Sequence, residues 1–230
     1  MSHSAFFYGT LLHPSILRRV IGHAGSGLEI CPALLLEHTR HKIEFADYPA
    51  VLPYERSREL FSGAGHAEPP ADERNVRGTL VTGLDDKDIA RLDLFEGDEY
   101  TRENVLVHPL GPFSALSSTP VPRSTIPSVG APLAPSTQSA TDAYTTAPEL
   151  PPLDSLSPPL PAETYIYVGP LDDLTPELWS YEDFVRENAW KWIGRGALDD
   201  NYAEVDRRRE MNGNTLKTEV VDTGASNPRV

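Results

Sequence analysis

The chain has 230 residues, of which 39% are hydrophobic and 22 are proline, so we expect the folded core to use only part of the chain. Its 34 acidic and 20 basic residues leave a formal net charge of −14, which argues against nucleic acid or an anionic membrane surface as a partner. No apolar run is long enough to span a membrane and no secretory signal is visible at the N-terminus, so we expect a cytoplasmic protein.

The first half of the chain predicts short strands around one helix. The helix covers residues 14–21, because Pro14 suits its first turn and Gly22 follows its end. Short apolar runs predict strands at residues 5–8, 33–36, 51–53 and 76–81. Pro53 lacks a backbone N–H and therefore favours the edge of a sheet for its strand.

The second half begins with a helix that has clear signals at both ends. Asp85 and Asp88 have the spacing of a capping box, and Gly97 is the expected terminator. Strands are predicted at residues 104–107 and 164–168, and if these two strands pair, the segment between them is a long hairpin loop. Further helix starts are predicted at Thr175-Pro176 and at Ser180, which is followed three residues later by Asp183.

Residues 109–161 differ from the rest of the chain. They contain 13 of the 22 prolines, many Ser and Thr, and few charged residues. Such a segment buries too little apolar surface to offset the entropy of ordering, so we predict a disordered insertion. The predicted domain is therefore 1–108 plus 162–212, followed by a flexible tail at 213–230. Its expected fold is α+β, a small mixed or antiparallel β-barrel with flanking helices.

Several possible functional features are weak. His38 and His41 are three residues apart, but no nearby cysteine or carboxylate pair completes a metal site, so we interpret residues 38–41 as a polar turn. Cys31 cannot form an intrachain disulfide, because it is the only cysteine, and its apolar context favours a buried packing role. The glycine-rich phosphate motifs and the nucleophile elbow are absent from the sequence.

One candidate site follows the first strand, at Tyr8-Gly9-Thr10-Leu11. Gly9 lets the backbone turn sharply, and successive amides at such a junction can point into one concavity that accepts an anion or oxyanion. An ordinary turn between a strand and a helix is the alternative interpretation.

A second candidate site is Glu96, which ends an apolar helix beside Phe95 and close to Asp93, Asp98 and Glu99. Apolar surroundings and like charges both raise a carboxyl pKa, towards that of a usable general base. The alternative is an acidic helix end on the surface. Carboxylates at a helix C-terminus oppose the helix dipole, so this position is locally unfavourable without a function.

Together these segments resemble the gamma-glutamylcyclotransferase-like superfamily, especially its plant avirulence-induced-gene-like branch. The resemblance rests on Tyr8-Gly9-Thr10-Leu11 and on Leu92-Asp93-x-Phe95-Glu96-Gly97-x-x-Tyr100-x-Arg102. Further matches are residues 48–53, 76–80 and 164–167. It covers about residues 5–108 and 162–195, and it implies a small β-barrel with helices.

The resemblance also implies a reaction. In the family, the α-amine of a γ-glutamyl group attacks its own γ-carbonyl, which releases 5-oxoproline and a free amine. The partner is thus a small γ-glutamyl substrate, no metal or organic cofactor is needed, and Glu96 carries over as the catalytic acid/base. The implied substrate-binding residues are Tyr8, Gly9, Thr10, Leu11, Tyr100 and Tyr165.

Alternatives remain open at this point. A catalytically silent binding domain could use the same fold, with the Pro-rich segment docking a protein partner in the polyproline II form. Glu96 favours the enzyme over this domain. A different acyl transfer with the same carboxylate is also open, because a fold does not define a substrate. For Trp179, Trp190 and Trp192, packing in the core is favoured over capping a pocket.

Overall fold

The computed structural model describes residues 2–64, 68–70, 74–119, 150–189 and 192. The predicted tail at 213–230 and the central part of the predicted insertion, residues 120–149, lie outside the described residues. Within the described ranges, no helix is long and apolar enough to cross a lipid bilayer.

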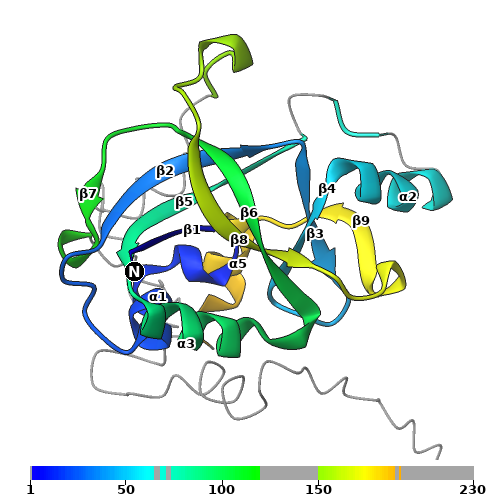
Figure 1. Cartoon of the computed structure of the whole chain (residues 1–230). Helices are drawn as coiled ribbons and strands as arrows, with labels where there is room; N and C mark the ends of the chain where they lie inside the picture. Colours follow the sequence, from blue (N-terminus) through cyan, green and yellow to red (C-terminus); the bar gives the residue numbers. More distant parts are fainter. Residues whose placement is uncertain (1, 65–67, 71–73, 120–149, 190–191, 193–230) are drawn as a thin grey trace, which may run out of the picture.

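A closed β-barrel forms the centre of the molecule (Figure 1). Its strands are β1 (His3–Phe7), β2 (Glu29–Leu36), β5 (Asn75–Leu84), β6 (Tyr100–Pro109) and β8 (Leu160–Tyr167). They follow the order β5-β1-β8-β6-β2, and β2 pairs with β5 again, which closes the sheet. The barrel is mixed, because β1 and β8 are parallel whereas the other neighbours are antiparallel. The predicted α+β fold, a mixed barrel with flanking helices, is confirmed.

Alternation along β1 divides its side chains between two apolar clusters. Phe6 belongs to the cluster that contains Leu80 of β5, whereas Ala5 and Phe7 belong to the larger cluster that includes the helices. Gly78 on β5 allows this packing, because a Cβ at that position would overlap the Phe6 ring. The alternation along β1 and the glycine on β5 are therefore both consistent with the register in which β1 pairs with β5.

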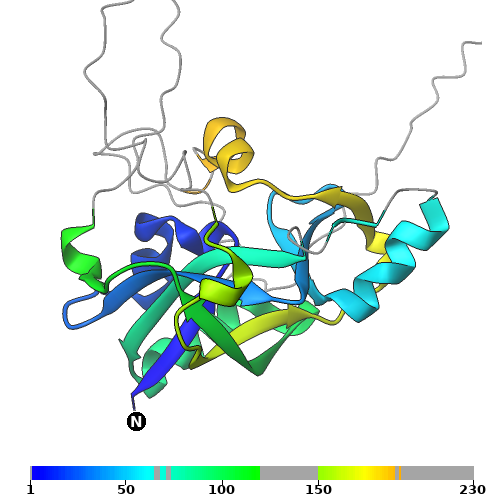
Figure 2. The ribbon, with the colours of Figure 1, turned by 90° about the horizontal axis from the view of Figure 1, so that it is seen from above.

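Helices α1 (Pro14–Ile21) and α3 (Asp86–Glu96) lie side by side along the barrel, and α5 (Tyr181–Glu187) lies near them (Figures 1 and 2). The α1 helix ends at Gly22, which has a left-handed φ of 76°. Asp85 and Asp88 form the predicted capping box of α3. Arg91 ties α3 to α1, because its Nη1 donates to the carbonyl of Ile21 at 2.6 Å. The predicted starts and ends of α1 and α3 are confirmed.

A second sheet lies beside the barrel and carries α2 (Tyr54–Ala64) (Figures 1 and 2). Its strands are β3 (His38–Ile43), β4 (Pro49–Pro53) and β9 (Leu174–Leu178), in the order β4-β3-β9. The edge position predicted for the strand of Pro53 is confirmed. The predicted polar turn at 38–41 is wrong, since these residues form β3, and the predicted helix start at Thr175-Pro176 is wrong, since these residues form β9.

The physical reason for both errors is a buried polar network. Thr39 and His41 point inward from β3, and the Thr39 hydroxyl bonds to Ser57 of α2 and lies 2.9 Å from His41 Nε2. His41 Nδ1 lies 3.1 Å from the carbonyl of Thr175, which links β3 to β9. Because the inward positions are polar, β3 has no apolar alternation in sequence. Pro176 is tolerated because β9 is an edge strand.

Regular structure extends into the range predicted as the disordered insertion. The β6 and β8 strands pair with each other, and β6 continues to Pro109 while β8 begins at Leu160. Between them, β7 (Ser114–Ala115) pairs with β2. Leu116 then packs into the core with 1% exposure, and Arg18 donates to its carbonyl. The packed domain therefore includes residues beyond the predicted boundary at 108.

The buried residues include the cysteine and two of the three tryptophans. Cys31 is fully buried, as predicted, and its thiol donates to the Gly111 carbonyl at 3.0 Å. Trp179 and Trp192 lie in the core and contact Phe184 edge-on or tilted. Trp190 lies outside the described residues. For these two tryptophans, core packing is confirmed.

Candidate active site

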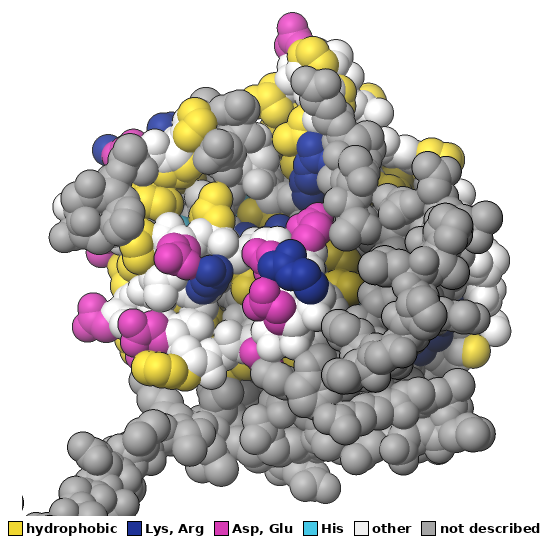
Figure 3. All heavy atoms as spheres, turned by 180° about the vertical axis from the view of Figure 1, so that it is seen from behind, with side chains coloured by type: hydrophobic (Ala, Val, Ile, Leu, Met, Phe, Trp, Pro, Cys, Tyr) yellow, Lys and Arg dark blue, Asp and Glu magenta, His cyan; other side chains and the backbone are white. Residues whose placement is uncertain are grey.

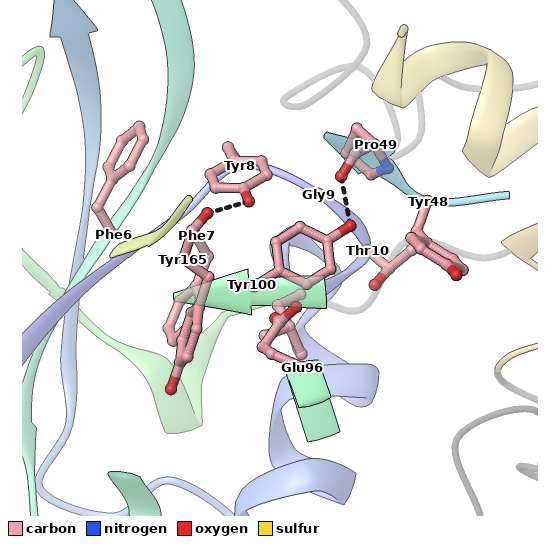
Figure 4. A pocket seen from close by; sticks show the side chains of 11 residues that line it. Phe6, Phe7, Tyr8, Gly9, Thr10, Tyr48, Pro49, Glu96, Tyr100 and Tyr165 are labelled. Atoms are coloured by element: carbon pink, nitrogen blue, oxygen red, sulfur yellow. Dashed lines mark hydrogen bonds between the residues drawn. The ribbon is translucent and has the colours of Figure 1, made fainter. Parts of the chain in front are cut away.

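A cavity lies where one end of the barrel meets the β3–β4 loop and the end of α3 (Figure 4). The structure brings all seven sequence-predicted site residues to its wall: Tyr8, Gly9, Thr10, Leu11, Glu96, Tyr100 and Tyr165. Sequence reasoning missed the remaining lining residues, which are Phe6, Phe7, Tyr48 and Pro49. Residues almost 160 positions apart in the sequence thus meet around one space.

The Gly9 turn is built by a short 3₁₀ helix, η1 (Thr10–Leu12), directly after β1. The amide of Leu12 donates to the Gly9 carbonyl at 3.0 Å. A Cβ at Gly9 would lie 3.0 Å from Cδ of Pro49, so the glycine allows close approach of the β3–β4 loop. The glycine therefore serves a tertiary contact as well as the local turn.

Two tyrosines tie that loop to the segment that follows α3. Tyr100 donates its hydroxyl to the Pro49 carbonyl at 3.0 Å, and Tyr48 donates its hydroxyl to Glu99 Oε2 at 3.1 Å. The Tyr100 ring packs edge-on against Tyr167, with centroids 5.7 Å apart. Tyr100 thus both lines the cavity and positions the loop opposite the Gly9 turn.

Glu96 is the last residue of α3 and is partly buried. Gly97 caps the helix with a φ of 68°, and its amide donates to the carbonyl of Asp93. Phe95 is fully buried and lies edge-on to Trp192, which fixes the helix end against the core. In Figure 4 the Glu96 side chain rises from the end of α3 towards Tyr100. Glu96 is the only carboxylate among the described lining residues.

Tyr165 is held at both ends. The Tyr8 hydroxyl donates to the Tyr165 carbonyl, and the Tyr165 hydroxyl donates to Asp93 Oδ1 at 2.9 Å. Arg102 Nε donates to the same Asp93 oxygen at 2.9 Å, and the Arg102 guanidinium also bonds to Glu163. Burial, and then the charges of Glu96 and Asp93, raise the pKa of the Tyr165 phenol far above its ordinary value. Tyr165 therefore stays protonated.

The outer surface offers a different environment. On the described part of the face in Figure 3, basic side chains lie beside acidic ones and form no broad basic patch. Arg102 belongs to such a mixed charge cluster and is not among the residues that line the cavity. Among the residues that the structure describes, no three His, Cys, Asp or Glu side chains gather as a possible metal site.

The missed lining residues carried little signal as ligands. Phe6 and Phe7 follow the strand pattern, which predicts burial without indicating an end that opens to a cavity. Tyr48 and Pro49 lie in a segment that contributes to the family resemblance. Only the contact between Pro49 and Gly9 shows that this segment faces the first motif.

The fold and cavity define a small mixed β-barrel protein whose cavity combines a glycine turn with a single carboxylate. The family model described as "Gamma-glutamyl cyclotransferase, AIG2-like" matches residues 5–116. Over these residues the chain is similar to the gamma-glutamyl cyclotransferase, AIG2-like family.

Similar proteins from Arabidopsis thaliana include Protein AIG2 C, which is 26% identical over 106 residues, 46% of this chain and 52% of that protein. AIG2-like protein D is 30% identical over 105 residues, 46% of this chain and 56% of that protein. The chain spans about half the length of these curated relatives.

Among solved structures, a solution structure from Arabidopsis thaliana aligns with a TM-score of 0.45 and 17% identity, covering 99% of this chain and 96% of that chain. A crystal structure of a gamma-glutamyl cyclotransferase specific to glutathione, from yeast, aligns with a TM-score of 0.40 and 16% identity, covering 90% of this chain and 86% of that chain.

Proposed function

We propose that the protein is a gamma-glutamylcyclotransferase-like acyltransferase that releases 5-oxoproline from a small γ-glutamyl amine or peptide. The observation that carries this proposal is the position of Glu96, which shares one cavity with the turn formed by Tyr8, Gly9, Thr10 and Leu11. A base and a set of backbone amides on one cavity are the groups that intramolecular aminolysis requires.

In this reaction the substrate enters with its α-amine as ammonium, which has no lone pair for attack. Glu96 takes one proton, and the amine nitrogen then bonds to the γ-carbonyl carbon to form a tetrahedral oxyanion. When the oxyanion collapses, the bond from the γ-carbon to the leaving nitrogen breaks, and Glu96 returns its proton to that nitrogen. The Glu96 carboxylate then takes the second proton from the ring nitrogen and passes it to the released amine, which leaves as ammonium. Such acid–base transfer contributes typically ~10²–10⁴ in rate.

The cavity supplies the remaining requirements through the chain's own residues. Backbone amides of the turn from Gly9 to Leu11 donate to the oxyanion, and one such donor is worth ~10²–10³ in kcat. Phe7 and Tyr165, which line the cavity, limit the space around the glutamyl group. Nucleophile and electrophile belong to one molecule, so holding the folded conformer lowers the entropic part of the barrier.

The test is 5-oxoproline release from a panel of γ-glutamyl amino acids, γ-glutamyl-ε-lysine and glutathione. We expect wild type to release 5-oxoproline and Glu96→Gln to lose this activity while remaining folded. Asp98→Asn is the matched control, because Asp98 is an exposed carboxylate on the same segment and does not line the cavity.

Equal turnover by Glu96→Gln and wild type would refute the role of Glu96. No release from any substrate by folded wild type would favour a catalytically silent binding domain. The substrate that releases 5-oxoproline fastest identifies the preferred leaving amine.

A further inference from the structure

The segment His38-Thr39-Arg40-His41 has no role in the proposed reaction, yet one of its side chains reaches the cavity turn. Arg40 of β3 donates from Nη1 to the carbonyl oxygen of Tyr8 at 2.6 Å, and also to the carbonyl of Arg77 at 3.4 Å. Its guanidinium lies over the Trp179 ring, 5.0 Å from the centroid. The amide of Trp179 donates back to the Arg40 carbonyl at 2.8 Å. Arg40 of the second sheet therefore holds Tyr8, the residue that follows β1, in place.

The Tyr8 carbonyl belongs to the peptide that joins Tyr8 to Gly9. No peptide bond of the described residues is cis, so the C=O and N–H of this peptide point in opposite directions. Tyr8 and Gly9 line the cavity, whereas Arg40 does not. Because the Tyr8 carbonyl is bonded to Arg40, the Gly9 amide of the same peptide points away from Arg40.

Arg40 also places a positive charge next to the peptide that joins Tyr8 to Gly9. Burial lowers the pKa of its guanidinium to about 10, opposed by the charge of Glu182, so Arg40 remains protonated at neutral pH. A cation that bonds to a peptide carbonyl polarises that peptide and strengthens its N–H as a donor. The same positive charge also stabilises a negative oxygen on the far side of the peptide.

We propose that Arg40 is a positioning residue that orients and polarises the Tyr8–Gly9 peptide, so that the Gly9 amide donates to the developing oxyanion. This inference rests on the proposed function, because the oxyanion forms only in that reaction. Arg40 touches no substrate and acts through the peptide it holds.

The chain contains a matched control for this contact. Arg56 of α2 also donates to two backbone carbonyls, those of Tyr167 at 2.6 Å and Gly169 at 2.8 Å, and it does not line the cavity. The variants are Arg40→Met and Arg40→Lys, with Arg56→Met and Arg56→Lys alongside. Both methionine variants remove an arginine from backbone carbonyls, but only Arg40→Met removes one next to the Gly9 turn.

We expect Arg40→Met to lower kcat about tenfold with KM changed less than threefold, because the lost stabilisation exists only in the transition state. Arg40→Lys retains the positive charge, and we expect it to recover most of the kcat lost in Arg40→Met. It is the variant to measure if Arg40→Met proves too unstable. The Arg56 variants reduce thermal stability but leave kcat unchanged at temperatures below unfolding. Wild-type kcat in both folded Arg40 variants, or an equal kcat loss in the Arg56 variants, would overturn the proposal.

A second readout does not depend on turnover. The backbone amide proton resonance of Gly9, measured by NMR without substrate, is expected to move upfield in Arg40→Met and to stay in place in Arg56→Met. If wild type releases no 5-oxoproline but the Gly9 resonance moves, the proposed function fails and the polarised peptide stands. If the Gly9 resonance does not respond to Arg40→Met, the inference fails whatever the activity.

Discussion

The buried imidazole of His41 makes a sharp prediction about stability and pH. His41 is fully buried between β3, α2 and β9, with Nε2 2.9 Å from the Thr39 hydroxyl and Nδ1 3.1 Å from the Thr175 carbonyl. The carbonyl can only accept, so Nδ1 carries the proton and Nε2 accepts from Thr39. Burial lowers the pKa of His41 to about 4 from its ordinary 6.5.

The sign follows from proton binding in the two states. Between pH 6.5 and about 4 the unfolded chain binds a proton at His41 and the folded protein does not. The stabilisation due to neutral His41 is therefore complete above pH 6.5 and is lost as the pH falls towards 4. Each pKa unit is worth about 1.4 kcal/mol, so the loss is roughly 3 kcal/mol across this range.

Urea unfolding at a series of pH values from 7.5 to 4 measures this loss as the difference between wild type and His41→Gln. Glutamine keeps a donor for Thr175 and an acceptor for Thr39 but does not titrate. We expect the difference in unfolding free energy between the two proteins to shift by roughly 3 kcal/mol in favour of the variant as the pH falls. Parallel pH profiles would refute the reasoning, because titration of the other groups is common to both proteins.

Two further predictions test the packing that builds the cavity and the domain boundary. Gly9→Ala places a Cβ 3.0 Å from Cδ of Pro49, so we expect the turn to shift and kcat/KM to fall about tenfold. In the control Gly111→Ala the nearest atom lies 3.9 Å from the new Cβ, and we expect kcat/KM to stay unchanged. Equal kcat/KM values for the two variants would contradict the close approach of Pro49 to Gly9. Leu116→Ala is expected to destabilise the fold by about 2–5 kcal/mol in chemical unfolding. The exposed Leu160→Ala is expected to cost under about 1 kcal/mol, and an equally small effect at Leu116 would show that residues after 108 do not pack on the core.

Local signals predicted the elements whose ends are determined by backbone chemistry. Pro14 and Gly22 bound α1, and the Asp85–Asp88 capping box begins α3, because these residues satisfy or spare the free amides and carbonyls of a helix end. The predicted strands share the same basis, since apolar runs in β1 and β8 reach the core.

The errors arose where tertiary contacts replace the local pattern. The β3 strand has polar inward residues, because Thr39 and His41 bond to α2 and β9, which sequence spacing does not reveal. Thr175-Pro176 has the local pattern of a helix start but lies in β9, because pairing with β3 outweighs the preference of proline for the first turn of a helix.

By itself, the sequence predicted the barrel with its flanking helices from local patterns of apolar residues and helix ends. The family resemblance, which rests on short motifs, singled out seven residues that line the cavity. Only the tertiary structure placed Glu96 on the same cavity as the Gly9 turn and brought Pro49 against it. It also directed Arg40 to the Tyr8 carbonyl. These contacts join residues far apart in the chain, and their geometry depends on how the second sheet and α3 pack on the barrel.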